Sequence, residues 1–253
     1  MDEFGMGTDL TNKSSRISTG MDGLDRLLNG GFPRGSVTLV SGTPGTGKTI
    51  VCFQYINSGL KNGEKCLFLA SDERIDNLIY QARELGFDFN PAIEIGQLKF
   101  MYLNPDKRDV HKEMEEEIRT GNYSRVVLDS LTPLSEVPVW VVNKGNEIIP
   151  SEGSMNTTTY PLDSIQATRV HIRRIMSILD EDECTTLVTT EIPEGSRHLS
   201  RDSISEFLVD GILILDLDST MDRRKLTIRK MRGTKHTLKP QDIEISPGGI
   251  KFL

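Results

Sequence analysis

The sequence predicts an α/β protein with a mainly parallel central sheet, flanking helices and an antiparallel β extension at its C-terminal end. Up to about residue 190, short apolar runs rich in β-branched residues alternate with helical patterns. This alternation favours parallel strands joined by crossover helices. After about residue 208, short strand patterns follow one another with turn signals and no helix between them. Closely spaced strands of this kind favour antiparallel pairing.

The expected elements follow a regular order in the parallel part. Each expected strand is a short apolar run, and each expected helix repeats apolar residues at the helical period, as Ile172, Ile175 and Ile178 do. The strands are expected at 36–40, 65–70, 98–102, 125–128 and 185–190. The helices are expected from Lys48 to about residue 60 and at 75–85, 110–119 and 162–179. The strands of the extension are expected at 208–217, 225–231, 242–245 and 250–253.

Length and composition favour one domain over residues 16–253, because a chain of 253 residues suits a single α/β sheet with insertions. Residues 1–15 are polar and lack periodicity, so we expect a mobile N-terminal arm. The net charge of −7 argues against a broad basic surface for nucleic acid. No apolar run is long enough to span a bilayer, and no signal-peptide pattern is visible, so we expect a cytoplasmic protein without membrane insertion.

The cysteines give no sign of a metal site or a disulfide framework. Cys52, Cys66 and Cys184 lie far apart in the sequence and have no metal-ligand spacing. We interpret them as small core residues of a protein in a reducing compartment.

A segment at about 132–160 interrupts the alternation. It contains several prolines and glycines, has no stable period, and includes the apolar patch Val137–Val142 with the single tryptophan, Trp140. We expect an insertion loop or a small hairpin there. The patch either packs on the domain, which we favour, or binds a partner, and the sequence leaves this open.

The clearest motif lies between the first strand and the first helix of the alternation. It matches the phosphate-binding pattern G-x-x-x-x-G-K-[ST] at every fixed position, which predicts a nucleoside triphosphate as ligand. Backbone N–H groups of such a loop surround the phosphates at a helix N-terminus. Lys48 is expected to reach the β- and γ-oxygens, and Thr49 to ligate magnesium. The predicted nucleotide-binding residues here are Gly42, Thr43, Pro44, Gly45, Thr46, Gly47, Lys48, Thr49 and Ile50.

Acidic residues end two of the expected strands. Asp129 follows the apolar run 125–128, and we expect it to bind magnesium, partly through water; the alternative is a turn cap after the strand. Asp72 and Glu73 follow another apolar strand and precede a helix. One of them could polarise the attacking water, or they could merely cap the helix and complement its dipole. Spacing alone does not separate these two readings.

Four segments together resemble the KaiC-like branch of the RecA-superfamily ATPases, in the KaiC/RadA-like group. Three of them are specific to that branch: TG-x-x-GLD at the start, G-G-x-P-R-G before the phosphate loop, and K-x-R-G-[ST]-x-H in the tail. The fourth is the phosphate loop itself, and the resemblance spans about residues 17–253. It implies a RecA-like P-loop ATPase core and ATP, rather than GTP, as the nucleotide.

The resemblance also implies roles for individual residues. The family's acidic pair maps onto Asp72 and Glu73 as part of the nucleotide site, with Glu73 activating water. The family's tail cations map onto Lys230 and Arg232, which then reach the γ-phosphate bound by a neighbouring subunit in a homo-oligomer, a hexameric ring. Without the resemblance, these two cations would be read as the solvated surface of an edge strand. Fixed positive charge beside the phosphoryl group would stabilise the transition state.

Three functions follow as hypotheses. The first is an ATP-hydrolysing oligomeric switch that acts on an unidentified protein partner. The second is an accessory ATPase of DNA repair or recombination; DNA binding is not favoured, because the chain is acidic and shows no N-terminal DNA-binding domain. The third is a non-catalytic ATP-binding assembly module similar to accessory proteins of archaeal motility motors.

Two further points concern the strand ends and the family's second domain. Thr189, Thr190 and Glu191 end the strand expected at 185–190 and could sense the γ-phosphate. The clock protein KaiC has two tandem copies of this domain, whereas this chain has one. The family's phosphorylated Ser-Thr pair maps onto Glu206-Phe207, so self-phosphorylation at that pair is not expected.

Overall fold

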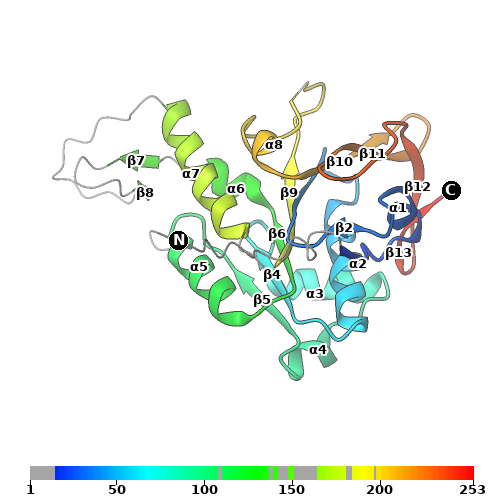
Figure 1. The fold of residues 1–253 in the computed structure, drawn as a ribbon, viewed down its shortest axis with the longest axis horizontal. Coiled ribbons are helices and arrows are strands. Elements are labelled where there is room, and N and C mark those ends of the chain that lie inside the picture. Colours follow the sequence, from blue (N-terminus) through cyan, green and yellow to red (C-terminus); the bar gives the residue numbers. More distant parts are fainter. Residues whose placement is uncertain are drawn as a thin grey trace, which may run out of the picture.

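A computed structural model describes residues 15–107, 110–136, 139–141, 148–150, 164–180, 184–196 and 198–253. Its main sheet has nine strands: β3 (Val37–Gly42), β4 (Cys66–Ala70), β5 (Leu98–Tyr102), β6 (Arg125–Asp129), β9 (Thr185–Glu191), β10 (Gly211–Asp218), β11 (Arg223–Met231), β12 (Gln241–Ser246) and β13 (Gly249–Phe252). The strand order is β13-β12-β11-β10-β3-β9-β6-β4-β5 (Figure 1). The sheet confirms the predicted α/β class.

The helices are α1 (Asp22–Leu27), α2 (Lys48–Lys61), α3 (Ile75–Glu84), α4 (Asn90–Glu94), α5 (Val110–Gly121), α6 (Leu131–Glu136), α7 (Ser164–Leu179) and α8 (Ser205–Leu208). Two small antiparallel sheets pair β1 (Arg16–Ile17) with β2 (Phe32–Pro33), and β7 (Val139–Val141) with β8 (Ile148–Pro150). None of the helices in the described ranges is long and apolar enough to cross a membrane.

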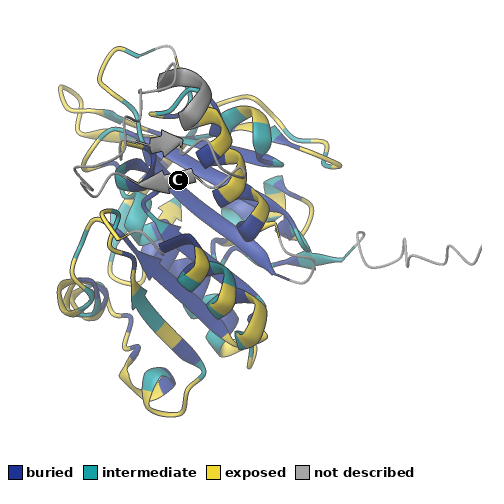
Figure 2. Cartoon of the chain, turned by 90° about the vertical axis from the view of Figure 1, so that its left-hand side faces the viewer, coloured by how far each residue is buried: buried dark blue, intermediate teal, exposed yellow. Residues whose placement is uncertain are grey.

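The sheet separates two apolar cores, because alternate residues of each buried strand face opposite sides. In β4, Phe68 packs with α1 to α4, whereas Leu67 and Leu69 pack with α5, α6 and α7. Figure 2 shows the buried strands between helices whose outer faces are exposed. The three cysteines are buried, as the sequence indicated.

The tail is arranged differently from the prediction in one respect. The strand β10 pairs in parallel with β3, so it belongs to the parallel part of the sheet. Only β11, β12 and β13 form the antiparallel extension. The sequence could not show this, because a short strand between turns gives no sign of whether a neighbour runs parallel or antiparallel to it.

The segment at 132–160 begins with a helix rather than a loop. Residues Leu131–Glu136 form α6, in which Leu131 and Leu134 are buried and Pro133 stands near the helix start, a position that proline tolerates. The expected hairpin is present as β7 and β8. The side chains of the patch Val137–Val142 lie outside the described residues, as does the predicted N-terminal arm except for Ser15.

Candidate functional site

The phosphate loop connects β3 to α2 in the conformation that its glycines permit. Gly45 and Gly47 have φ angles of 81° and 103°, in the left-handed region that favours glycine. A Cβ atom at Gly47 would lie 3.2 Å from Cδ1 of Ile245 on β12. No acidic residue stands in the first turn of α2, so its N-terminal N–H groups remain suited to an anion.

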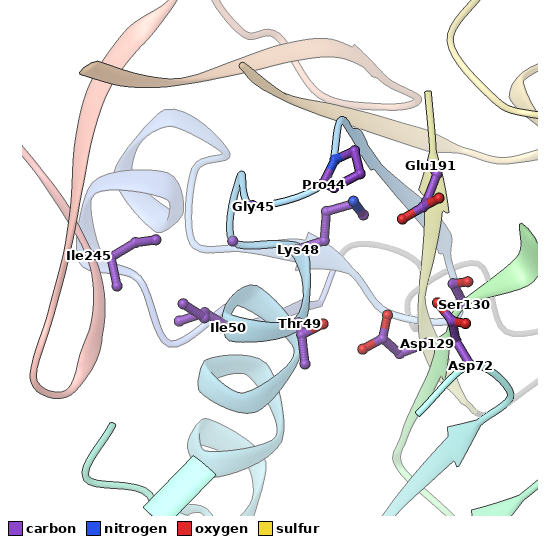
Figure 3. Close-up of a pocket in the computed structure, with 11 residues that line it drawn as sticks. Pro44, Gly45, Lys48, Thr49, Ile50, Asp72, Asp129, Ser130, Glu191 and Ile245 are labelled. Atoms are coloured by element: carbon purple, nitrogen blue, oxygen red, sulfur yellow. The ribbon is translucent and has the colours of Figure 1, made fainter. Parts of the chain in front are cut away.

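A cavity of about 320 Å³ lies against this loop. It brings together the ends of β3, β4, β6 and β9 at one edge of the sheet, where ligands of open α/β sheets bind (Figure 3). Its lining residues are Pro44, Gly45, Gly47, Lys48, Thr49, Ile50, Asp72, Asp129, Ser130, Glu191 and Ile245. Three predicted loop residues are not part of the lining: Gly42, Thr43 and Thr46. The Thr46 hydroxyl donates to the Thr43 carbonyl at 2.9 Å.

Lys48 is held by the loop itself. Its Nζ atom donates to the carbonyl oxygens of Gly42 at 3.0 Å and Thr43 at 3.1 Å. Burial lowers the pKa of Lys48, while the carboxylates of Glu191 and Asp129 oppose that shift. Phosphate oxygens would be stronger, charged acceptors for the same ammonium group. Lys48 therefore lines the cavity, and its contact with phosphate oxygens stays a prediction.

Asp129 ends β6 as a half-buried residue in the wall of the cavity. It accepts a hydrogen bond from the Thr189 hydroxyl of β9, the strand that lies between β3 and β6. Burial raises the pKa of Asp129, and the hydroxyls of Thr189 and Thr49 and the charge of Lys48 lower it. The Thr49 hydroxyl and the Asp129 carboxylate offer the hard oxygen donors that magnesium prefers, so the residues present fit this ion.

The acidic pair after β4 is divided between two environments. Asp72 lines the cavity, whereas Glu73 is not among its lining residues. Oε1 of Glu73 accepts hydrogen bonds from Asn77 Nδ2 at 2.6 Å and from the Arg74 N–H at 3.2 Å, at the start of α3. The structure thus brings Asp72 to the nucleotide site, and water activation by Glu73 stays a prediction.

Lys230 and Arg232 lie at the opposite edge of the sheet. Met231 pairs with Gly211, and Gly211 pairs with Thr38 near the start of β3. The phosphate loop follows the other end of β3, and the four steps from Thr38 to Gly42 alone span about 13 Å at the rise of a strand. Neither cation lines the cavity of its own chain.

The cavity also contains residues that sequence reasoning placed less firmly or missed. Glu191 ends β9 opposite Gly42 and lines the cavity, while its backbone N–H donates to the Thr132 hydroxyl of α6 at 3.0 Å. Its position after a strand was the only signal. Ile245 and Ser130 were missed. Ile245 reaches the loop only because β12 and β13 fold back over α2, and no local pattern indicates that contact.

Comparisons with known proteins find matches over most of the chain. The family model described as "ATPase: KaiC" matches residues 17–141 and 154–253. A UPF0273 protein of Pyrococcus horikoshii is 30% identical over 239 residues, which cover 93% of this chain and 92% of that protein. The circadian clock oscillator protein KaiC of Picosynechococcus is 30% identical over 241 residues, which cover 94% of this chain but only 44% of the clock protein.

A solved structure shows the same fold. The crystal structure of a KaiC-like protein from the hyperthermophilic archaeon Pyrococcus horikoshii matches with a TM-score of 0.76 at 30% sequence identity. The match covers 94% of this chain and 99% of that protein chain. The antiparallel tail strands therefore belong to a fold already seen in a relative.

Proposed function

The chain belongs to the KaiC family of ATPases, and we propose that it hydrolyses ATP and works as an oligomeric, nucleotide-dependent switch. One observation carries this proposal. The phosphate loop, Thr49 and Asp129 converge on one cavity, while the two tail cations lie at the far edge of the same sheet. Each protomer thus has a binding half and a cationic half that cannot meet within one chain.

The binding half would hold the nucleotide and its metal. The loop N–H groups and Lys48 would bind the β- and γ-phosphates. Thr49 and Asp129 would hold magnesium, which supplies positive charge against the phosphate oxygens when bound. Ion binding would also relieve the unfavourable burial of the Asp129 carboxylate, whose pKa is raised by desolvation.

The hydrolytic step needs a carboxylate that orients water and accepts its proton. We assign this role to Glu73 on the strength of the family resemblance. Its carboxylate contacts Asn77 and does not line the cavity, and catalytic hydrogen bonds often form only in the substrate complex. Asp72 and Glu191, which already line the cavity, are the carboxylates against which Glu73 must be tested.

The cationic half would act on the next subunit. A head-to-tail contact would place the sheet edge with Lys230 and Arg232 over the cavity of a neighbour. Repeated contacts of this heterologous type close into a ring when the rotation allows, and we propose a hexamer. A cation supplied by the neighbour is worth about 10³- to 10⁵-fold in turnover in other phosphoryl-transfer enzymes. ATP binding would then alter the surface offered to a protein partner.

ATP turnover and mass in solution test this function together. We expect steady-state hydrolysis by the unmodified chain and a mass that increases with ATP. Lys48→Ala should abolish both effects, and the exposed Lys61→Ala at the other end of α2 serves as the matched control. Turnover no higher than that of Lys48→Ala would overturn hydrolysis; a mass that still responds to ATP would then favour the assembly module. Single-stranded DNA should change neither quantity.

A further inference from the structure

Asp210, one residue before β10, connects the start of β3 to the end of β11. Its Oδ1 atom accepts a hydrogen bond from Arg232 Nη1 at 3.0 Å, and its Oδ2 atom accepts one from the Val37 N–H at 3.1 Å. Its backbone N–H donates to the Val37 carbonyl at 2.9 Å, and its own carbonyl accepts from the Arg232 N–H at 2.9 Å. The carboxylate is therefore fixed to the core sheet on one side and to the arginine on the other.

One nitrogen of the Arg232 guanidinium is bonded to Asp210, and much of the side chain is exposed. Its side chain is 57% exposed, and the Asp210 side chain is 26% exposed. In the described ranges no second side-chain hydrogen bond of Arg232 occurs, so most of its five N–H donors remain available to a phosphate. The single bond to Asp210 restricts the direction in which the guanidinium points.

The backbone around Arg232 is anchored independently of Asp210's carboxylate. Arg16 of β1 donates to the Thr234 hydroxyl at 2.6 Å and to the Gly233 carbonyl at 3.2 Å. The path of residues 232–234 therefore has its own support, and the carboxylate acts mainly on the Arg232 side chain.

Lys230 belongs to the same arrangement. Its Nζ atom donates to the carbonyl oxygen of Val209, the residue before Asp210, at 2.6 Å and to that of Glu206 at 3.4 Å. Burial and the nearby Arg232 lower the pKa of Lys230, and the Asp210 carboxylate opposes that shift. Asp210 thus neutralises part of the repulsion between two cations that serve the same phosphate.

We propose that Asp210 is a positioning residue that presents Arg232 to the nucleotide site of the neighbouring subunit. This inference rests on the proposed function, because it requires Arg232 to act between subunits. The physical reason is pre-organisation: a guanidinium already oriented loses less side-chain freedom when it meets the phosphate. An ion pair this exposed adds little to folding stability, so its main effect should be on catalysis.

Asp210→Asn separates the two contacts of the carboxylate. The amide oxygen can still accept from the Val37 N–H, whereas the amide NH₂ group would face the Arg232 donor. We expect turnover to fall about 10- to 100-fold, because a small misplacement of a catalytic group costs about this much in rate. The KM for ATP should remain almost unchanged. Asp216→Asn, the same change at an exposed position of β10, is the matched control and should retain turnover within about twofold.

Mixed oligomers test whether Asp210 acts through the arginine of its own chain on the cavity of the neighbouring chain. Equal amounts of Lys48→Ala and Arg232→Ala protein should recover turnover, because the working cavity and the working arginine then come from different chains. Adding Asp210→Asn to the Lys48→Ala chain should reduce that recovery about 10-fold or more. Adding it to the Arg232→Ala chain should leave the recovery unchanged.

The outcomes separate the inference from the proposed function. No recovery in the reference mixture would overturn the shared site and Asp210's role with it. Only the role of Asp210 would be overturned if Asp210→Asn left the recovery unaffected, or reduced it equally whichever of the two chains carried it. Increased turnover would also overturn it, since the ion pair would then hold Arg232 away from the neighbour.

Discussion

The nucleotide site is built from charged side chains that burial disfavours. Lys48 has a lowered pKa and Asp129 a raised one, and desolvation is the largest cause in both. Each lies close enough to the opposite charge of the other for that charge to oppose the shift. The Lys48 amine also donates to loop carbonyls. Such an arrangement is suited to receive a phosphate and a cation together, which satisfy both groups.

Glu73→Gln should spare ATP binding and reduce turnover by about 10²-fold or more, the typical contribution of a general base. The amide keeps the size of the side chain and loses the ability to accept a proton. Equilibrium ATP binding and steady-state hydrolysis check the two halves of this prediction.

Asp72→Asn is the comparison for Glu73→Gln, because Asp72 lines the cavity and is its neighbour in sequence. If Glu73→Gln retained turnover while Asp72→Asn lost it, the assignment to Glu73 would be wrong. A loss of ATP binding in Glu73→Gln would also contradict the role in water activation.

Element by element, the sequence predicted what local pattern determines. The strand expected at 98–102 coincides with β5, and the helix expected at 75–85 ends within one residue of α3. The parallel pairing of β10 with β3 and the contact of Ile245 with the loop were not predictable, because both depend on residues far apart in the chain. The end of a strand indicates a site residue, but not which cavity it reaches.

The turn between β3 and α2 depends on glycine at position 47. Gly47→Ala places a side chain at φ 103°, with its Cβ atom 3.2 Å from Ile245, so we expect about 1–2 kcal/mol of destabilisation and weaker ATP binding. Gly63→Ala is the matched control: its φ is 74°, nothing lies within 4 Å of the added Cβ, and it is far from the cavity along α2. Urea unfolding and nucleotide titration check the pair.

Gly63→Ala should share the backbone strain and retain ATP binding. Equal ATP affinity in both variants would contradict the role of the Gly47 turn in phosphate binding.

The contact between α5 and α7 contains a buried histidine pair. The rings of His111 and His171 lie 4.6 Å apart, and His171 Nε2 bonds to the Leu134 carbonyl of α6 at 2.7 Å. Burial, followed by the charges of His171 and Arg174, lowers the pKa of His111 to about 3. The folded state therefore holds His111 neutral.

This pair should make stability fall in mild acid. Because the pKa of His111 is depressed on folding, its contribution is complete above about pH 6.5, its unfolded pKa, and is lost as the pH falls toward 3. The free energy of unfolding should drop by about 1.4 kcal/mol per pH unit in this window. Burial also lowers the pKa of His171, so His111→Gln should reduce, without abolishing, the slope between about pH 7 and pH 5, whereas His198→Gln, at an exposed position, should not change it. Identical slopes in the two variants would contradict the account.

At the scale of the whole molecule, the sheet keeps the cavity and the two tail cations of one chain apart. Strands β3 and β10 run in parallel, so the loop after β3 and the turn that carries Arg232 lie at opposite edges of one rigid sheet. The phosphate loop was predicted from its own motif, whereas Lys230 and Arg232 were predicted through the family resemblance alone. The resemblance also implied the hexameric ring, whereas the protein partner follows from neither the sequence nor the resemblance, because it depends on the surface of a second molecule.

The most direct test of a site shared between subunits is turnover per chain as a function of protein concentration, with mass measured in the same samples. A shared site predicts that turnover per chain is close to zero where the protein is monomeric and rises as oligomers form. Arg232→Ala should bind ATP and remain inactive at every concentration. Full turnover per chain in samples that contain only monomers would contradict the central claim.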